Sequence, residues 1–306
     1  MSATEKQNQT CITEFILLGF GDLLDLPVTP FLLFLVIYMV TMMGNILILM
    51  VVVADQHLHT PMYLFLSNLS CLEMCYSSTI LPKLPSLAAA TYTAGCPISF
   101  GGCLAQLHFF HFLGSTEAVL LATMAYDRYV AICNPLRYTL IMSPHTCLLL
   151  AVASWSTGFV HAMMHSVMTS QLRFCGHNRI HHFFCDIKPL LNLACCSTSL
   201  NMALLNIVTT SIVLFPFTLI VLSYLYITSF VFQKVRSQEG RWKLFSTCTS
   251  HLTIVALLYI PVLFNYTPPS AGISPKRDVQ VSLMYSAVTP ALNPLVYTLR
   301  NQEVRS

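Results

Sequence analysis

One long apolar run of the chain ends in Met124-Ala125-Tyr126-Asp127-Arg128-Tyr129-Val130-Ala131-Ile132-Cys133, where an aspartate and an arginine stand side by side. Ionisable residues at the edge of a bilayer are costly to place, so they usually serve a function. The composition agrees with a membrane setting, because only 9% of the 306 residues are charged, against roughly 25% in soluble domains. The stretch therefore predicts the inner end of a membrane helix that carries a functional acid–arginine pair.

The beginning of the chain predicts an extracellular segment over residues 1–26. Met1 to Glu14 are polar and mixed in charge, without the apolar core and cleavage site of a signal peptide, so we expect the first membrane span to direct insertion. Asn8-Gln9-Thr10 is a glycosylation sequon in this segment, which favours an extracellular position for Asn8. An unused sequon is the alternative. The net charge of +3 is unfocused and does not indicate nucleic-acid binding.

The hydropathy pattern predicts an all-α membrane protein with seven helices. A spanning helix needs about 20 mostly apolar residues, and we find such runs at 27–53, 60–86, 98–131, 144–168, 198–232, 243–266 and 275–299. The domain is therefore expected to cover 27–299, followed by a short cytoplasmic tail, 300–306. A hydroxyl residue before proline predicts helix starts at Thr60-Pro61, Ser143-Pro144 and Ser274-Pro275.

Interior prolines are expected to kink the last three helices, at Pro216, Pro261, Pro290 and Pro294. With the N-terminus outside, eight Lys/Arg fall inside and seven outside by our count of the sequence, a difference too small to orient the chain. The orientation depends instead on the sequon and on the cysteines.

Half of the twelve cysteines cluster on the predicted outer side: Cys96, Cys103, Cys175, Cys185, Cys195 and Cys196. This crowding beside an extracellular loop indicates disulfides, because that side is oxidising. The sequence alone leaves their connectivity open.

The third predicted span carries one continuous stripe of residues at helical spacing: Cys103, Leu107, Phe110, Gly114, Glu117, Leu121, Met124 and Arg128. From Cys103 to Arg128 the helix would rise about 37 Å. One helix face would thus join the outer end of the bundle to the arginine at its inner end.

The stretch at 124–133 is similar, almost letter for letter, to the signature of vertebrate olfactory receptors, which are rhodopsin-like G-protein-coupled receptors. Further matches are Leu58-His59-Thr60-Pro61-Met62-Tyr63, Ser67-Asn68-Leu69-Ser70, Lys243 to His251, and Thr289-Pro290-Ala291-Leu292-Asn293-Pro294. The resemblance covers Glu14 to Asn301 and suits the tetrapod-type (class II) branch. Ile260 departs from a usual Gly and Leu244 from a usual Ala.

The resemblance implies two disulfides, Cys103–Cys185 and Cys175–Cys195. A third bond, between Cys96 and Cys196, stays open. His182 and Cys185 have a spacing that suits a soft metal, but a disulfide at Cys185 would remove the thiolate, so we expect no metal site there.

The resemblance also implies the activation machinery. Asp127 would neutralise Arg128 until activation releases the arginine toward a G-protein, with Tyr129 part of the same motif. Asn293-Pro294-Leu295-Val296-Tyr297 resembles the Asn-Pro-x-x-Tyr element, in which Tyr297 swings toward the arginine and Tyr224 is its partner. Lys243 would meet the G-protein; ordinary positive-inside charge is the alternative.

Two acids lie in apolar runs, Glu73, where the family more often has Asp, and Glu117. With Asn45 and Asn293 they are expected to form a polar core that binds a sodium ion or a proton. The alternative is that they are simply protonated and hydrogen-bonded. We expect no other cofactor.

If the resemblance holds, the ligand site lies in the outer half of the bundle. The expected lining is His108, Phe110, His111, Gly114, Ser115, Ile187, Leu205, Val208, Thr209, Ile212, Tyr259, Val262, Tyr266, Ser282 and Ser286. Mostly apolar residues with a few hydroxyls suit a small volatile odorant. His111 would bond the ligand or a neighbouring helix. None of these residues is an acid, which counts against an amine ligand.

The expected function is an odorant-activated receptor of olfactory cilia that uses a stimulatory, olfactory-type G-protein to raise cyclic AMP, with trafficking chaperones as further partners. A receptor outside the nose that responds to a metabolite is the main alternative. A transporter or channel would show repeats or paired broken helices. A membrane enzyme would need a nucleophile, an acid pair or a metal cluster, for which Glu73 and Glu117 are the one candidate pair.

Overall fold

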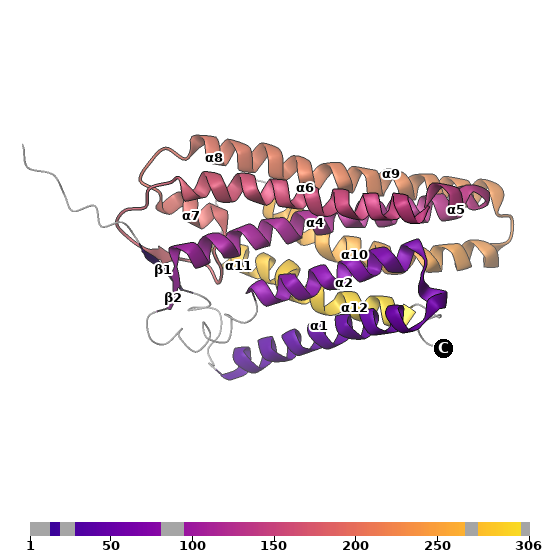
Figure 1. Cartoon of the computed structure of the whole chain (residues 1–306), viewed down its shortest axis with the longest axis horizontal. Coiled ribbons are helices and arrows are strands. Elements are labelled where there is room, and N and C mark those ends of the chain that lie inside the picture. The colour runs from indigo at the N-terminus through magenta and orange to yellow at the C-terminus, as the bar shows by residue number, and fades with distance from the viewer. Residues whose placement is uncertain (1–12, 19–27, 81–94, 267–274, 301–306) are drawn as a thin grey trace, which may run out of the picture.

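The chain folds into an elongated bundle of long helices (Figure 1). The structure is a computed structural model that describes residues 13–18, 28–80, 95–266 and 275–300. Asn8, the tail residues 301–306 and the predicted end of the second span, 81–86, lie outside these ranges.

Seven helical segments of the described chain run along the bundle, which confirms the predicted fold class. They are α1 (Val28–Ala54), α2 (Pro61–Ile80), α4 (Phe100–Cys133), α6 (Pro144–Ser170), α8 (Ser199–Leu204) continued by η4 (Leu205–Thr209) and α9 (Thr210–Lys234), α10 (Gln238–Tyr266), and α11 (Pro275–Leu283) continued by η5 (Met284–Val288) and α12 (Thr289–Arg300). Short helices lie between them: η1 (Gln56–Leu58), η3 (Pro135–Arg137), α5 (Tyr138–Ile141) and α7 (Ile187–Leu193).

The helix starts follow local sequence signals. Helices α2, α6 and α11 begin at the predicted prolines, and the Ser143 hydroxyl accepts a hydrogen bond from the Thr146 N–H (3.3 Å), which satisfies a free donor of the first turn. Helix α10 begins at Gln238 rather than at 243. A span criterion counts apolar residues, so it misses the polar first turns of a helix that extends beyond the membrane.

Two helices contain a π-helical turn, η4 over Leu205–Thr209 and η5 over Met284–Val288. A π turn inserts an extra residue and re-aims the side chains around it. In η4 the re-aimed turn includes Thr209, which is buried.

The long helices differ in where they place their apolar and their charged residues. By length and hydropathy alone, four described stretches could cross a membrane: Leu32–Ala54, Pro144–Ser170, Ser199–Lys234 and Gln238–Leu263. Their outward faces are apolar; Val53 and Phe215 are 78% and 68% exposed. Helix α4 carries the charged residues Glu117, Asp127 and Arg128, and it contacts α2, α6 and α9. Glu117 and Asp127 are buried, so the other helices shield their carboxyl groups from lipid.

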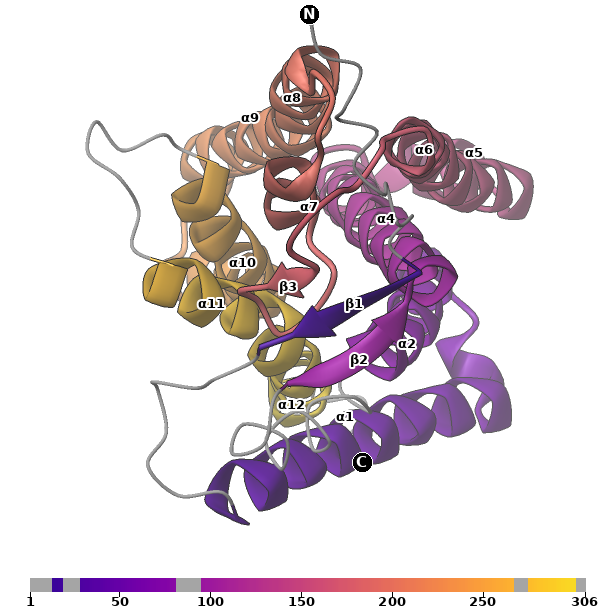
Figure 2. The same cartoon turned by 90° about the vertical axis from the view of Figure 1, so that its left-hand side faces the viewer.

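A small three-stranded sheet lies across one end of the bundle (Figure 2). Strand β1 (Glu14–Leu17) pairs antiparallel with β2 (Cys96–Ser99) and parallel with β3 (Arg179–Ile180). Phe15 and Leu17 of β1 are fully buried. The segment before the first helix is therefore packed onto the bundle, which the sequence did not predict.

Helices α4 and α6 approach each other closely at Gly158. A Cβ atom placed there would lie 2.5 Å from the Phe112 carbonyl oxygen and 3.0 Å from the Thr116 nitrogen. Only glycine lets the two backbones come this close.

Candidate functional site

A cavity of about 60 Å³ lies among the long helices. Its lining comes from α2, α4, α6, η4, α9, α10 and η5: Tyr76, Phe110, His111, Gly114, Ser115, Glu117, Ala118, His161, Thr209, Ile212, Val213, Leu258, Tyr259, Val262 and Tyr285. Most of these side chains are apolar or aromatic, and the polar ones cluster on the α4 side. This is the composition of a site for a small organic ligand with few polar groups.

The cavity brings together about half of the residues predicted to bind ligand: Phe110, His111, Gly114, Ser115, Thr209, Ile212, Tyr259 and Val262. Six others do not line it: His108, Ile187, Leu205, Val208, Ser282 and Ser286. His108 turns to α6, where its Nδ1 lies 3.1 Å from the Ser166 hydroxyl. Tyr266 belongs to α10, but its side chain lies outside the described part.

Glu117 also lines the cavity, although no acid was predicted in the ligand site. The cavity extends deeper along α4 than expected, because Glu117 lies on the same face as Gly114 and one turn further inward. An acid is therefore part of the floor of the cavity.

A buried hydrogen-bonded chain connects α4, α6 and η4 beside the cavity. The Ser115 hydroxyl lies 2.7 Å from His161 Nδ1, and His161 Nε2 lies 3.1 Å from the Thr209 hydroxyl. His165 Nε2 lies 3.1 Å from both His161 Nε2 and the Thr209 hydroxyl. His111 stacks on His165, with ring centroids 4.9 Å apart. We call these five residues the histidine cluster.

A second polar group lies below the cavity. The Asn293 side-chain amide donates a hydrogen bond to Glu73 Oε1, and the side chains of Glu73 and Glu117 interact with each other. Three buried oxygen atoms of this group have no hydrogen-bond partner: Glu73 Oε2, Glu117 Oε1 and Asn293 Oδ1. Asn45 is buried too, but its amide donates to the Thr41 carbonyl of its own helix (2.9 Å).

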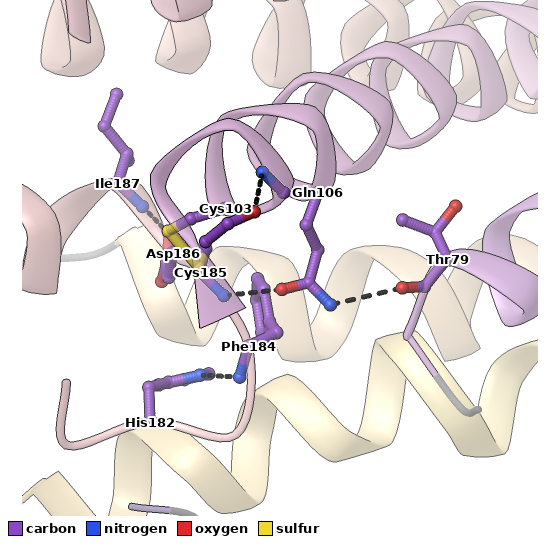
Figure 3. Close-up of a disulfide and its surroundings, with 10 residues drawn as sticks. Thr79, Cys103, Gln106, His182, Phe184, Cys185, Asp186 and Ile187 are labelled. Atoms are coloured by element: carbon purple, nitrogen blue, oxygen red, sulfur yellow. Dashed lines mark hydrogen bonds between the residues drawn. A yellow bond between two sulfur atoms is a disulfide. The ribbon is translucent and has the colours of Figure 1, made fainter. Parts of the chain in front are cut away.

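The predicted disulfide Cys103–Cys185 is present and fixes the loop after β3 onto α4 (Figure 3). Beside it, Gln106 connects three elements, since its Oε1 accepts from the Cys185 N–H (3.0 Å) and its Nε2 donates to the Thr79 carbonyl (3.2 Å). The next loop residue inward, Phe184, packs on Phe110 with ring centroids 4.6 Å apart. Because Phe110 lines the cavity, the loop covers the cavity from this end.

The same loop continues into α7 through a capping aspartate. Asp186 Oδ1 accepts a hydrogen bond from the Ile187 N–H (2.6 Å) (Figure 3). Burial raises the pKa of this carboxyl above its usual range, against the opposing effects of Lys188 and of the N–H donors. The cap positions Ile187, which is buried.

The second predicted disulfide, Cys175–Cys195, is also present. Cys96 and Cys196, for which a third bond was left open, are both free. In the described ranges, no group of three or more His, Cys, Asp or Glu side chains is arranged to hold a metal ion.

At the other end of α4, the two residues of the acid–arginine pair contact different partners. The Tyr138 hydroxyl donates to Asp127 Oδ1 (2.8 Å), and an Arg128 Nη contacts the Met62 sulfur. Adjacent residues of a helix point in different directions, which accounts for the two separate contacts. Burial, followed by the nearby Asp127 carboxylate, raises the pKa of Tyr138, so this hydroxyl stays a donor.

A further chain connects three helices near Arg128. The Tyr224 hydroxyl lies 2.8 Å from His251 Nδ1, and His251 Nε2 lies 3.1 Å from the Leu121 carbonyl oxygen. Tyr224 therefore bonds α10. The side chain of Tyr297, its predicted partner, lies outside the described part. Tyr129 packs against Tyr226, and Lys243 is exposed on α10. Pro294 is buried in α12.

Sequence reasoning missed three histidines of these networks. His161 and His165 stand four residues apart on α6, which puts both on one helix face, and this spacing was the available signal. His251 ends the stretch that begins at Lys243, but nothing local assigns it a partner.

Comparison with known proteins agrees with the geometry. A sequence profile described as "Olfactory receptor" matches residues 34–306. The chain is 55% identical to human olfactory receptor 12D1 over 298 residues, 97% of this chain and 92% of the relative. It is 53% identical to human olfactory receptor 12D2, over 97% of this chain and 96% of the relative. Mouse olfactory receptor 1E16 is 46% identical over 98% and 94%.

Proposed function

Since the chain belongs to the olfactory receptor family of G-protein-coupled receptors, we propose that a small volatile odorant binds in its central cavity and activates a stimulatory G-protein. The family signals and does not catalyse a reaction. The chain is a multi-pass membrane protein, and we assign it to the plasma membrane of olfactory cilia.

The observation that carries the proposal is the layout of α4. This helix lines the cavity with His111, Ser115 and Glu117, and it carries Asp127 and Arg128 at its opposite end. A ligand that moves α4 relative to its neighbours changes the surroundings of Arg128 through one rigid element.

The G-protein is proposed to bind at the end of the bundle that carries Arg128. The Arg128 side chain is partly buried against Met62, and Lys243 is exposed in the early part of α10. Two cations at one end suit the acidic surface of a G-protein. Activation is proposed to release Arg128 from Met62, with stimulation of adenylyl cyclase as the result.

The acids below the cavity are proposed to hold a monovalent cation, a sodium ion or a proton. One buried oxygen of each acid and the Asn293 Oδ1 have no hydrogen-bond partner, which is costly unless something positive pairs with them. Asn293 is already fixed on Glu73, so a cation there would connect α2, α4 and α12. A change in its occupancy would change how these helices pack.

The proposal is tested by cyclic AMP measurement in cells that express the chain with a stimulatory G-protein and a trafficking chaperone. The cells are exposed to a library of volatile compounds, and surface expression is measured alongside. We expect a dose-dependent rise for a subset of the library over cells without the receptor. Silence to the whole library with confirmed surface expression would refute the proposal.

A further inference from the structure

The histidine cluster contains a buried nitrogen atom without a hydrogen-bond partner. His111 is 4% exposed and lines the cavity, and its Nε2 is buried without a hydrogen-bond partner. A buried imidazole nitrogen without a partner is costly, so a ligand that forms a hydrogen bond with it would be favoured. The nearest polar lining residue on the same face of α4 is Ser115, one turn further along the helix.

The network behind Ser115 can run in either of two directions. If Ser115 donates to His161 Nδ1, then His161 Nε2–H donates to Thr209, which donates to His165 Nε2. If the tautomers reverse, His165 donates to Thr209, Thr209 to His161, and His161 to Ser115. In the first case Ser115 offers the cavity an acceptor, and in the second it offers a donor.

A hydroxyl group matches both directions, because it donates and accepts at the same time. It can bridge His111 Nε2 and the Ser115 oxygen, which belong to side chains four residues apart on one helix face. A ketone only accepts and fits one direction. A hydrocarbon leaves His111 without a partner. Apart from Glu117, His161 and Thr209, the remaining lining is apolar or aromatic and suits a short carbon chain.

We propose that the ligands of this receptor are small, uncharged molecules with a hydroxyl head, and that His111 and Ser115 hold the hydroxyl. This inference depends on the proposed function. The cavity of about 60 Å³ limits the ligand to a small molecule. Binding would also fix the direction of the hydrogen bonds that run from Ser115 to Thr209. It would thereby connect the ligand to η4, the π turn that precedes α9.

The test uses probes that share an unbranched five-carbon skeleton and differ in the polar group: 1-pentanol, 2-pentanone, pentylamine, pentanoic acid and pentane, within a wider volatile library sorted by head group. Cyclic AMP responses are compared at equal surface expression in wild type, His111→Phe and Ser115→Ala. His177→Phe is the matched control, because His177 is exposed in a loop away from the cavity. Thermal stabilisation of the purified receptor by each probe gives a readout that needs no G-protein.

We expect hydroxyl compounds to be the most potent class, ketones weaker, and hydrocarbons inactive. Potency for hydroxyl compounds should fall about tenfold or more in His111→Phe and in Ser115→Ala, and stay unchanged in His177→Phe. Equal responses to every head group, or hydroxyl responses that survive both substitutions, would overturn this inference but not the proposed function. So would a preference for amines lost in Glu117→Gln. Silence toward every class would instead mean that the proposed function fails.

Discussion

The Tyr224 hydroxyl of α9 lies 2.8 Å from Nδ1 of His251 on α10, and the other nitrogen of the same imidazole reaches the Leu121 carbonyl of α4 at 3.1 Å. One buried histidine therefore holds three helices together between the cavity and Arg128. His251 is 2% exposed, so its two bonds are shielded from competing water or lipid headgroups.

Removing the hydroxyl of Tyr224 or the imidazole of His251 should weaken the packing of α4, α9 and α10. We expect Tyr224→Phe and His251→Phe each to lower the melting temperature of the purified receptor, because a net hydrogen bond contributes about 1 kcal/mol. The double variant should lose less than the sum of the two single losses, since both remove the same bond. Tyr226→Phe is the control, as Tyr226 is 63% exposed on the same helix. Strictly additive losses would mean that the two side chains act independently.

The close approach at Gly158 gives a second prediction. Gly158→Ala should sharply reduce surface expression and stability, because overpacking of a tight core costs about 1–3 kcal/mol. Gly101→Ala, where an added Cβ meets nothing within 4 Å, should behave as wild type. Normal surface expression of Gly158→Ala in flow cytometry would contradict the packing of α4 on α6.

The beginnings of α2 and α6 were predictable because their signals are local. Ser143 and Pro144 satisfy the first turn of a helix whatever lies elsewhere. Strand β1 was not predictable, because Phe15 pairs with Ile98 across more than a quarter of the chain, and four residues carry no periodicity that specifies a distant partner.

The sequence predicted on which helix face and at what depth in the bundle many site residues lie. It predicted fewer of the contacts that their side chains make. The stripe on the third span placed Phe110, Gly114 and Glu117 on one side of α4, and all three line the cavity. His108 belongs to the same helix but bonds Ser166, because the neighbouring α6 covers that face. Which helix covers which face is a tertiary property that helical spacing does not contain.

The disulfide Cys103–Cys185 should be essential to the covered end of the cavity. We expect Cys103→Ser to abolish surface expression or the odorant response, since loss of a native disulfide typically costs about 2–5 kcal/mol and frees the loop that packs Phe184 on Phe110. Cys96→Ser should have little effect, because Cys96 is free. A Cys103→Ser receptor with wild-type expression and potency would argue against the loop as a cover.

The acid pair below the cavity should respond to cations. If a sodium ion binds the oxygens of Glu73 and Glu117, sodium chloride should raise the melting temperature of the wild type above its value in choline chloride at equal ionic strength. Glu117→Gln should remove the difference. The same melting temperature in both salts would leave a shared proton as the cation of this site.

The most direct test of the account compares wild type with Arg128→Ala at matched surface expression, using an odorant that activates the wild type. We predict that the cyclic AMP response disappears in the variant while the odorant still stabilises the purified receptor against heat. This result would separate the ligand end of α4 from its G-protein end. An undiminished cyclic AMP response in Arg128→Ala would contradict the claim that this helix carries the signal to the arginine.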